Sequence, residues 1–392
     1  MNTYQKTHRL YDEDGYATEF TAQVLSCEET KEHLFCVVLD QTLFFPEAGG
    51  QSPDKGTLDG VPVCDVQISD EVILHTLEAP LTVGSYVEGL IDWEHRFSNM
   101  QQHSGEHLFS GMVFREFGYH NVGFHLSDQI VTMDFDGVLS EEDIERLEWQ
   151  VNEAIVKNVP IVVTYPSDEE RKALSYRSKT EIEGQVRIVT IEGYDVCACC
   201  APHVKRTGEI GFFKVMQVQN HKGGVRISIL CGFRGLQAFR EKQKVVSELT
   251  ALLTTGQDKL PESVARLLAT QQTLSGQLFH VRQELLQMKL EQIPTTTEHV
   301  ILFEENVDKA VAQKAVNQLA REHGGICGFF IGTDGNGYRY LLSSQSMDCR
   351  KTADLLRERL CAKGGGSEAM IQGSVSATKE QILATLGEQL SI

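Results

Sequence analysis

Apolar positions in the first ninety residues come in short runs separated by polar turns, a pattern typical of β-strands. Strands are expected at residues 35–39, 61–64 and 72–74, which are rich in branched and aromatic side chains. Between the first two lie residues 45–51 (FPEAGGQ), whose glycine pair permits a tight turn and the close approach of another group. Taken alone, this stretch could equally be a hairpin loop.

A helix is expected from about Glu94 to Phe117, and Gly105 and Gly111 within it lower the helix propensity. Glycines in a helix indicate close packing against a neighbour. A second helix should follow the capping-box-like start at Ser140. Further strands are expected at residues 129–136, 161–163, 186–189, 211–215 and 225–229. Strands interleaved with two helices, without a regular βαβ rhythm, predict an α+β domain with a largely antiparallel sheet.

After Arg234 the spacing of apolar residues becomes helical, with a break at residues 256–261. The second helix carries apolar residues in alternating steps of four and three, which is typical of a coiled-coil seam. That seam comprises Leu267, Leu274, Leu278, Val281, Leu285 and Met288, with Gln271 at one position. The pattern suits either a helical hairpin packed within one chain or an arm that joins two chains into a homodimer.

Residues 294–297 are expected to form a linker. In the last hundred residues, strand and helix patterns alternate, as is typical of a small α/β domain. The helix expected at residues 349–361, with Lys363 after it, carries five basic residues against two acidic ones, a local charge of +3. The glycines 364–366 are expected to form a loop beside this helix. Glycine N–H groups next to basic side chains suit a phosphate backbone. The candidate RNA contacts here are Arg350, Lys351, Gly364, Gly365 and Gly366.

The overall charge limits the choice of partners. A chain of 392 residues suggests two to four domains, and its net charge of −19 argues against non-specific binding to nucleic acids or acidic membranes. The polar N-terminus does not resemble a signal peptide, and no apolar run is long enough to cross a bilayer. Ten irregularly spaced cysteines without a leader indicate a cytoplasmic protein with free thiols and a metal site.

Two short motifs carry the candidate chemistry. In the first expected helix, His103 and His107 are four residues apart, so both imidazoles lie on one face. Cys199 and His203 add a thiolate and a third imidazole, and this combination of ligands is one that Zn²⁺ prefers. The neighbouring cysteines at 197 and 200 are alternatives, although the spacing favours Cys199. The sequence therefore predicts a zinc site.

Basic residues follow this cluster along the chain. Between residues 201 and 226 there are five positive charges and one negative, a local charge of +4. Beside a metal site they could meet nucleic-acid phosphates, or they could be scattered surface charges. The candidate RNA contacts in this stretch are Lys205, Arg206, Lys222 and Arg226.

The motifs resemble those of a known family. The H-x-x-x-H, C-x-x-x-H and T-G-E-I-G (residues 207–211) pieces, in this order, are similar to those of the stand-alone alanyl-tRNA editing proteins and of the editing domain of alanyl-tRNA synthetase. Residues 45–51 resemble the family's glycine-rich motif, with Ala48 in place of a third glycine. The resemblance covers nearly the whole chain, and no stretch resembles a synthetase aminoacylation domain. It therefore implies the long form of the family, which edits in trans.

The resemblance implies hydrolysis of tRNA(Ala) mischarged with serine or glycine, at a Zn²⁺ held by His103, His107, Cys199 and His203. Whether the zinc is catalytic or only orients the substrate stays open; if one ligand is released, we expect it to be His203. Gln51 and Thr42 are the candidates for reading the seryl hydroxyl, because a site built for that hydroxyl would be left unpaired by alanine.

The resemblance and the patterns together imply an α+β protein of four parts. These are a β-barrel-like domain (1–93), an editing core with zinc (94–234), a helical hairpin (235–293) and a C-terminal tRNA-binding or dimerisation domain (294–392).

Two other functions fit some of the residues. His103 to His107 also reads as H-x-x-E-H, a metalloprotease pattern in which Glu106 would be the general base. Cys199 speaks against it, because proteases of that type do not use a thiolate ligand. The second alternative is a tRNA-binding module in which zinc is only a structural staple.

Overall fold

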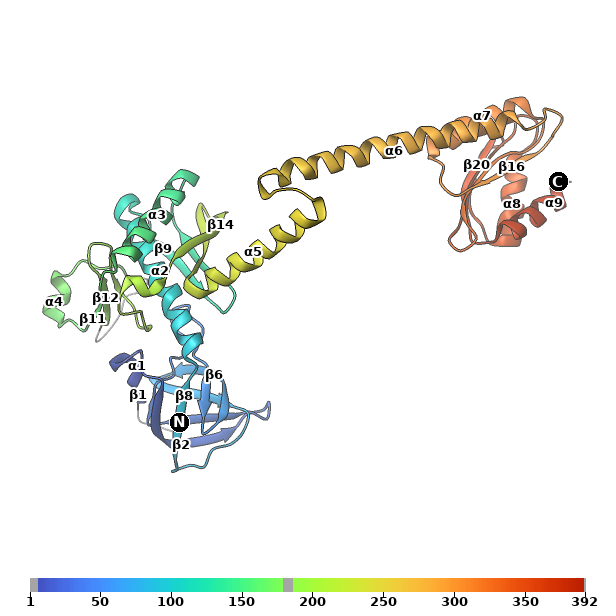
Figure 1. Cartoon of the computed structure of the whole chain (residues 1–392). Helices are drawn as coiled ribbons and strands as arrows, with labels where there is room; N and C mark the ends of the chain where they lie inside the picture. Colours follow the sequence, from blue (N-terminus) through green and yellow to red (C-terminus); the bar gives the residue numbers. More distant parts are fainter. Residues whose placement is uncertain (1–5, 179–185, 391–392) are drawn as a thin grey trace. The chain divides into compact units, whose positions relative to one another are not determined.

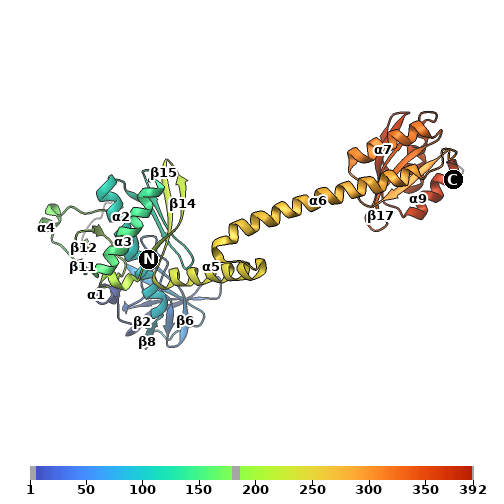
Figure 2. The same cartoon turned by 45° about the horizontal axis from the view of Figure 1, so that its top comes forward.

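The computed structural model describes residues 6–178 and 186–390, and its fold is mixed α+β with several sheets, as expected. The chain divides into two compact units, Met1–Glu248 and Leu249–Ile392 (Figures 1 and 2). Each unit is described by itself. No described helix combines the length and the apolar character that crossing a membrane requires. The expected division into four domains stays a prediction.

A closed six-stranded barrel forms the first part of unit 1 (blue in Figure 1). Its strands, in the order of their pairing, are β2 (Glu19–Glu29), β3 (Phe35–Leu39), β7 (Val72–Leu77), β6 (Val61–Ser69), β5 (Gly56–Leu58) and β8 (Tyr86–Ile91). The short β1 (His8–Arg9) pairs with β4 (Gln41–Thr42), and α1 (Leu10–Glu13) follows β1. Strands β3, β6 and β7 confirm the three strands expected at residues 35–39, 61–64 and 72–74. Each contributes a fully buried side chain to the barrel core, for example Leu39, Val66 and Ile73.

The helix α2 (Trp93–Phe117) runs from the barrel into the rest of unit 1, as expected. The middle of the helix is buried on all sides, because Gly105 and Gly111 allow neighbouring segments to approach it closely. A Cβ at Gly105 would lie 2.4 Å from the Cys231 sulfur, and one at Gly111 would lie 2.5 Å from the Tyr194 carbonyl oxygen. The close packing inferred from these glycines is therefore confirmed.

Two antiparallel sheets and one long helix, α3 (Glu141–Lys157), pack against α2. The larger sheet has the order β14 (Phe213–His221), β15 (Gly224–Cys231), β10 (Val131–Phe135) and β9 (Asn121–Leu126). The smaller has β11 (Ile161–Thr164), β12 (Ile188–Ile191) and β13 (Asp195–Ala198). Helix α3 begins at its predicted cap Ser140, which accepts a bond from the Asp143 N–H. The remaining elements are α4 (Asp168–Ala173) and the short helix η1 (Thr207–Ile210).

The start of α5 (Gly232–Leu253) is tied to α2. Arg234 donates to the Ser98 hydroxyl at 2.6 Å and to the Asn99 side-chain oxygen at 2.6 Å. It also donates to the Ser127 carbonyl at 2.7 Å. The first two bonds fix the start of α5 against the helix that carries two of the candidate metal ligands.

Unit 2 begins within α5 and contains η2 (Gln257–Lys259) and the long α6 (Leu260–Glu291). Its sheet has the order β16 (Val300–Glu304), β17 (Cys327–Thr333), β18 (Gly337–Ser343), β20 (Met370–Val375) and β19 (Lys363–Gly366). Helices α7 (Lys309–Glu322), α8 (Cys349–Leu360) and α9 (Lys379–Leu390) complete it.

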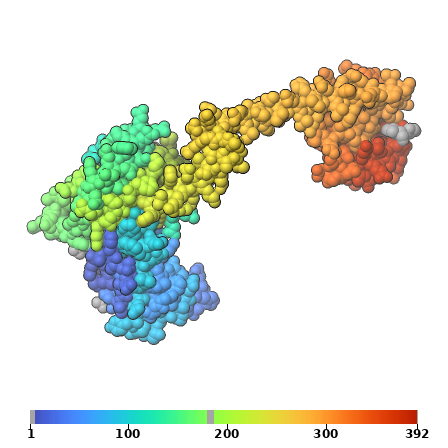
Figure 3. Space-filling view, viewed as in Figure 1, coloured from blue at the N-terminus to red at the C-terminus, as the bar shows by residue number. Residues whose placement is uncertain are grey.

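The predicted apolar seam of α6 is exposed within the described chain. Leu267, Leu274 and Leu285 are between 53% and 58% exposed, whereas α6 buries Leu286 and Leu290 instead. Figure 3 shows side chains of α6 at the surface on the face in view. The homodimer expectation is not tested by this arrangement.

The glycine run of unit 2 is not the predicted loop. Residues 364–366 belong to the edge strand β19, where Gly364 pairs with Gly373 of β20. The Tyr340 hydroxyl lies beneath both positions, 2.8 Å and 2.5 Å from where their Cβ atoms would be. Glycine is needed at positions 364 and 373 because both strands pass directly over that side chain, a constraint that a single sequence does not reveal.

Candidate metal centre

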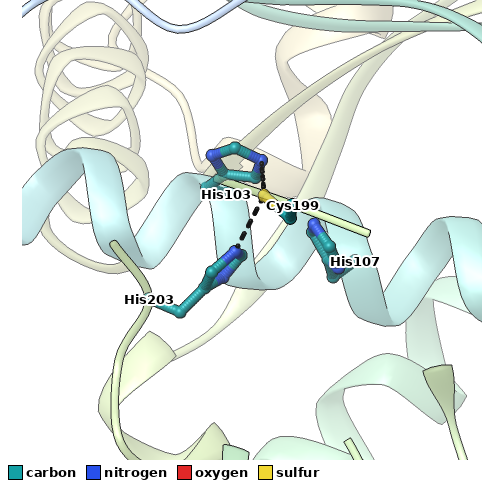
Figure 4. Close-up of side chains that lie close together, drawn as sticks. All are labelled: His103, His107, Cys199 and His203. Carbon is teal, nitrogen blue, oxygen red and sulfur yellow. Dashed lines mark hydrogen bonds between the residues drawn. The ribbon is translucent and has the colours of Figure 1, made fainter. Parts of the chain in front are cut away.

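The four predicted metal ligands converge at the centre of unit 1. His103 and His107 project from one face of α2, and Cys199 and His203 come from the loop after β13 (Figure 4). The Cys199 sulfur lies 3.5 Å from Nε2 of His103 and 3.3 Å from Nε2 of His203. The three imidazoles are at most 7% exposed. Residues almost a hundred positions apart therefore share one buried cluster.

The other nitrogen of each imidazole is held by a protein group. Nδ1 of His103 lies 2.8 Å from the Gln51 amide oxygen, and Nδ1 of His107 lies 2.9 Å from Oδ2 of Asp195. Nδ1 of His203 lies 3.0 Å from the Ser104 hydroxyl. Because amide and carboxylate oxygens only accept, Nδ1 of His103 and of His107 must carry the proton.

This arrangement fits a tetrahedral metal ion. With Nδ1 engaged, Nε2 presents its lone pair to the centre, which is the arrangement that protein partners impose on metal-binding histidines. Zinc bonds of about 2.3 Å to sulfur and about 2.0 Å to nitrogen give a sulfur–nitrogen edge of about 3.5 Å. The observed 3.5 Å and 3.3 Å match that edge. The cluster could therefore hold a metal ion such as Zn²⁺.

The charges of the cluster also suit a cation. Burial alone would raise the pKa of Cys199, but His103 and His203 hold it well below its ordinary value, so the sulfur is a thiolate. Burial lowers the pKa of His203 to about 3, so this ring is neutral. Burial opposes a charge on His107, yet its contacts with Asp195 and the Cys199 thiolate raise its pKa well above the ordinary value, so a positive charge, whether a proton or a metal ion, is favoured at Nε2. The cluster thus draws positive charge to its centre.

The geometry distinguishes among the three neighbouring cysteines. Only Cys199 among them is near the ring nitrogens of two histidines. Burial raises the pKa of Cys197 to about 11, so it remains a thiol, and Cys200 is exposed. The Cys197 thiol donates to the Ala198 carbonyl at 3.6 Å. Cys199 is therefore the ligand that the structure favours, as the spacing predicted.

The glycine-rich stretch of residues 45–51 lies against β9. Leu126 N–H donates to the Gly50 carbonyl at 2.7 Å, and a Cβ at Gly50 would lie 2.2 Å from the Phe124 carbonyl oxygen. Gly50 also has a φ of +84°, which disfavours other residues. The close approach expected from this stretch is confirmed, and it places the side chain of Gln51 beside His103.

Gln51 and Thr42, the two candidate pocket residues, have different surroundings. The Gln51 side chain is 1% exposed, and its Nε2 has no hydrogen-bond partner within residues 6–178 and 186–390. The Thr42 hydroxyl is already engaged in the barrel core: it accepts from the Phe44 N–H and lies 2.9 Å from Nε2 of His75. A role for Thr42 in substrate recognition stays a prediction.

Two glutamines next to the first histidine attach α2 to its surroundings. Gln102 donates to the Cys231 carbonyl at 2.9 Å and accepts from the Cys231 N–H at 2.7 Å. Gln101 donates to the Glu209 carbonyl at 2.8 Å. The T-G-E-I-G motif therefore lies against the helix turn that precedes His103.

A fully buried ion pair joins the barrel to α2. Arg96 donates to both carboxylate oxygens of Asp54 and to the carbonyls of Gly15 and Leu43. Asp54 in turn accepts from the Phe45 N–H at 2.6 Å. The pair holds Leu43 and Asp54, which lie on either side of the glycine-rich stretch, against the helix that carries His103.

Glu106, the base of the metalloprotease alternative, is buried beside the cluster. Its Oε1 accepts from the Ser110 hydroxyl and from the Asn121 amide, both at 2.6 Å. Its Oε2 lies 3.8 Å from Nε2 of His107. Sequence reasoning gave Glu106 no part in ester hydrolysis, and its position does not exclude the protease alternative.

The predicted RNA contacts of unit 1 are only partly free of acidic neighbours. Arg226 pairs with Asp134 through two bonds of 2.6 Å and 2.7 Å, and the Lys205 amine lies 4.2 Å above the Tyr16 ring. Arg206 donates to the Asn158 carbonyl. Lys222 is exposed in the turn between β14 and β15. Their contact with RNA stays a prediction.

The basic helix of unit 2 is largely neutralised by its own acidic neighbours. Arg350 pairs with Asp348 at 2.8 Å and with Glu368 at 2.5 Å. Arg357 pairs with Asp354, and Arg359 pairs with Glu388. The predicted contacts Arg350, Lys351 and Gly364–Gly366 share unit 2, but their binding to RNA is untested.

None of the three groups that hold the imidazoles was predicted in that role, since Gln51 was expected only to read the seryl hydroxyl. Ser104 was hidden because serine next to a histidine is common in any helix. Asp195 lies 88 positions from His107, and no local pattern connects the two residues. Such partners emerge only when the strand and the helix are brought together.

Two family models match parts of the chain. The threonyl and alanyl tRNA synthetase second additional domain matches residues 186–228, which include Cys199 and His203. The model for tRNA synthetases class II (A) matches residues 4–95, of which residues 6–95 include the barrel and the first residues of α2.

Several curated proteins are similar over long stretches. The alanyl-tRNA editing protein AlaX-L of Pyrococcus horikoshii is 27% identical over 97% of this chain and 98% of its own length. The alanyl-tRNA editing protein Aarsd1 of Danio rerio is 28% identical over 93% of each chain. The alanine–tRNA ligase of Pyrococcus furiosus is 31% identical over 81% of this chain, but only 36% of the ligase is covered.

Proposed function

Since the chain belongs to the alanyl-tRNA editing proteins, the family of AlaX-L and Aarsd1, we propose that it is a deacylase acting on tRNA(Ala) mischarged with serine or glycine. The observation that carries the proposal is the cluster in which three histidines turn Nε2 toward the Cys199 thiolate. Hydrolysis of the ester would occur at the 3′ end of the tRNA. A location in the cytoplasm, where charged tRNAs are used, belongs to the same proposal.

The proposed zinc ligands are His103, His107, Cys199 and His203. A zinc ion held there would supply Lewis acidity at the ester carbonyl or would hold the amino acid in place. The chain itself keeps the three imidazoles oriented through Gln51, Asp195 and Ser104. If one ligand gives way to substrate, His203 is the proposed one, because at 7% it is the most exposed of the three imidazoles.

Gln51 is proposed to distinguish serine from alanine. Its oxygen is engaged by His103, which leaves the buried Nε2–H₂ group as a donor in need of an acceptor. An unpaired buried donor costs about 1–3 kcal/mol, which corresponds to roughly 5- to 150-fold in rate or affinity. A seryl hydroxyl oxygen could relieve that cost, whereas alanine has no such group. Glycine has none either, so this donor would favour serine over glycine.

The acceptor end of the tRNA is proposed to meet the basic residues that follow the cluster, Lys205, Arg206, Lys222 and Arg226. In unit 2, Arg350, Lys351 and the glycines of β19 are proposed as further contacts. Phosphate contacts of this kind make binding weaken with salt. A homodimer formed through α6 or the C-terminal domain remains part of the proposal.

A deacylation assay tests the function. Purified protein is mixed with Ser-tRNA(Ala), Gly-tRNA(Ala) and, as the control substrate, Ala-tRNA(Ala), each with and without a zinc chelator. We expect serine to be released much faster than alanine and the release to fall after chelation. Binding of tRNA without release of serine in either condition would instead support the zinc-stapled binding module.

Two variants then test the assignment of the pocket. Gln51→Met removes both the acceptor for His103 and the free donor, and it should slow release of serine by roughly 5- to 150-fold. Thr42→Val removes a hydroxyl of the barrel core. If Thr42 is a core residue, this change lowers the free energy of unfolding and leaves the preference for serine over alanine intact.

A further inference from the structure

Asp195 and Arg177 form an ion pair directly behind the metal cluster. Arg177 donates from Nε to Oδ1 of Asp195 at 2.7 Å and from Nη2 to Oδ2 at 2.8 Å. The same Oδ2 accepts from Nδ1 of His107 at 2.9 Å. Asp195 is 6% exposed. The three side chains therefore form a continuous line from the guanidinium to the imidazole.

We propose that Asp195 and Arg177 are positioning residues for His107: the carboxylate keeps Nε2 of the ring pointed at the metal centre, and the guanidinium keeps the carboxylate in place. The inference rests on the metal site proposed above. Carboxylates that accept from a metal-binding imidazole fix its tautomer and its orientation, and their loss typically weakens metal binding by about 10- to 100-fold.

The backbone supports this role on both sides of the pair. Arg177 N–H donates to the Val196 carbonyl at 2.8 Å, and Ala198 N–H donates to the Arg177 carbonyl at 2.9 Å, so Arg177 is joined to β13 itself. On the helix side, a Cβ at Gly111 would lie 2.7 Å from the Cβ of Asp195. The absence of a side chain at Gly111 lets β13 approach α2 one turn after His107.

The ligand atoms of His107, Asp195 and Cys197 lie close enough together to suggest a second metal site. Arg177 argues against it, because its guanidinium bonds to both carboxylate oxygens of Asp195 and would repel a cation placed there. The pair is better explained as a support for the first site.

The experiment measures zinc binding and does not depend on catalysis. Zinc affinity is determined by competition with a chromophoric chelator for the wild type, Asp195→Asn, Arg177→Lys and Arg177→Met. We expect zinc to bind roughly 10- to 100-fold more weakly to Asp195→Asn than to the wild type. The zinc affinity of Arg177→Lys should lie between those of the wild type and Arg177→Met, because lysine keeps the positive charge but cannot make the two parallel hydrogen bonds of the guanidinium.

Asp134→Asn is the matched control for zinc binding. It disrupts a second two-bond arginine–aspartate pair, between Asp134 of β10 and Arg226 of β15. Because the hydrogen bonds and ion pairs of Asp134 and Arg226 within residues 6–178 and 186–390 do not reach the metal cluster, zinc affinity should stay within about twofold of the wild type. A loss equal to that of Asp195→Asn would show a general effect of breaking such pairs and would overturn the proposal.

A second readout separates positioning from folding. In protein labelled with ¹⁵N-histidine, the wild-type zinc form should show His107 with its proton on Nδ1. Asp195→Asn should alter that signal, because the asparagine amide can also donate to the ring, whereas Arg177→Lys should retain it. If Asp195→Asn fails to fold, Arg177→Lys and Arg177→Met still decide the point.

The outcomes distinguish this inference from the proposed function. A wild type that binds no zinc overturns the metal site and this inference together. A wild type that binds zinc, with folded variants of Asp195 and Arg177 that bind it equally well, overturns this inference alone and leaves the deacylase proposal standing.

Discussion

His75 in the barrel core should make unit 1 less stable in acid. The side chain is fully buried, with Nδ1 3.2 Å from the Val37 carbonyl and Nε2 2.9 Å from the Thr42 hydroxyl. Burial lowers the pKa of His75 from its ordinary value to about 4. The folded barrel therefore keeps this ring neutral at pH values where the unfolded chain takes up a proton.

The direction and the size of the change in unfolding free energy follow from the difference in pKa between the folded and unfolded states. Above pH 6.5 both states are neutral and His75 contributes no pH dependence. As the pH falls from about 6.5 towards 4, only the unfolded state gains a proton, so stability is lost. Between pH 7.5 and pH 5 the loss due to His75 is about 2 kcal/mol, and the full shift corresponds to about 3 kcal/mol.

Urea unfolding followed by tryptophan fluorescence measures this change in unit 1, because both tryptophans, Trp93 and Trp149, lie there. The free energy of unfolding is measured at pH 7.5 and pH 5 for the wild type and for His75→Gln, which cannot titrate. The drop between the two pH values should be about 2 kcal/mol smaller in the variant. Equal drops, with unchanged urea dependence, would show that the barrel admits a charged His75 and would refute the reasoning.

Three further predictions concern the metal centre. Gly111→Ala should lower the free energy of unfolding by about 1–3 kcal/mol and weaken zinc binding, because the new methyl group would press on Tyr194 and Asp195. Gly276→Ala in α6 is the control in thermal unfolding, because its methyl group would meet no atom within 4 Å. Cys199→Ala should abolish stoichiometric zinc in elemental analysis while Cys200→Ala retains it, and the reverse result would reassign the ligand. Glu106→Gln should leave deacylation nearly unchanged; loss of a peptidase activity in this variant would support the metalloprotease alternative.

The convergence of the four candidate ligands was predictable, because each pair has a spacing that a helix or a short loop can use. The two glycines of α2 also indicated that the helix packs closely against its neighbours, which proved to be Cys231 and Tyr194. In both cases the signal was local, and the physical requirement could be read from neighbouring residues.

Features that depend on distant partners could not be predicted. The glycines 364–366 have the composition of a loop, yet they pair with β20 as an edge strand, and at Gly364 the Tyr340 side chain leaves no room for a Cβ. The basic helix α8 looked like a charged surface until Asp348, Glu368 and Glu388 came to lie beside its arginines. Charge counts along the sequence miss such pairing across elements.

The hydrogen bonds to the three histidines also bear on how the protein matures. Gln51 belongs to the stretch between barrel strands, Ser104 to the central helix, and Asp195 to a strand of the smaller sheet. A partly folded chain would offer an incoming ion only a helical histidine pair with freely turning rings. High affinity would therefore arise only once all three regions have docked, so that uptake of the ion reports completed assembly of unit 1.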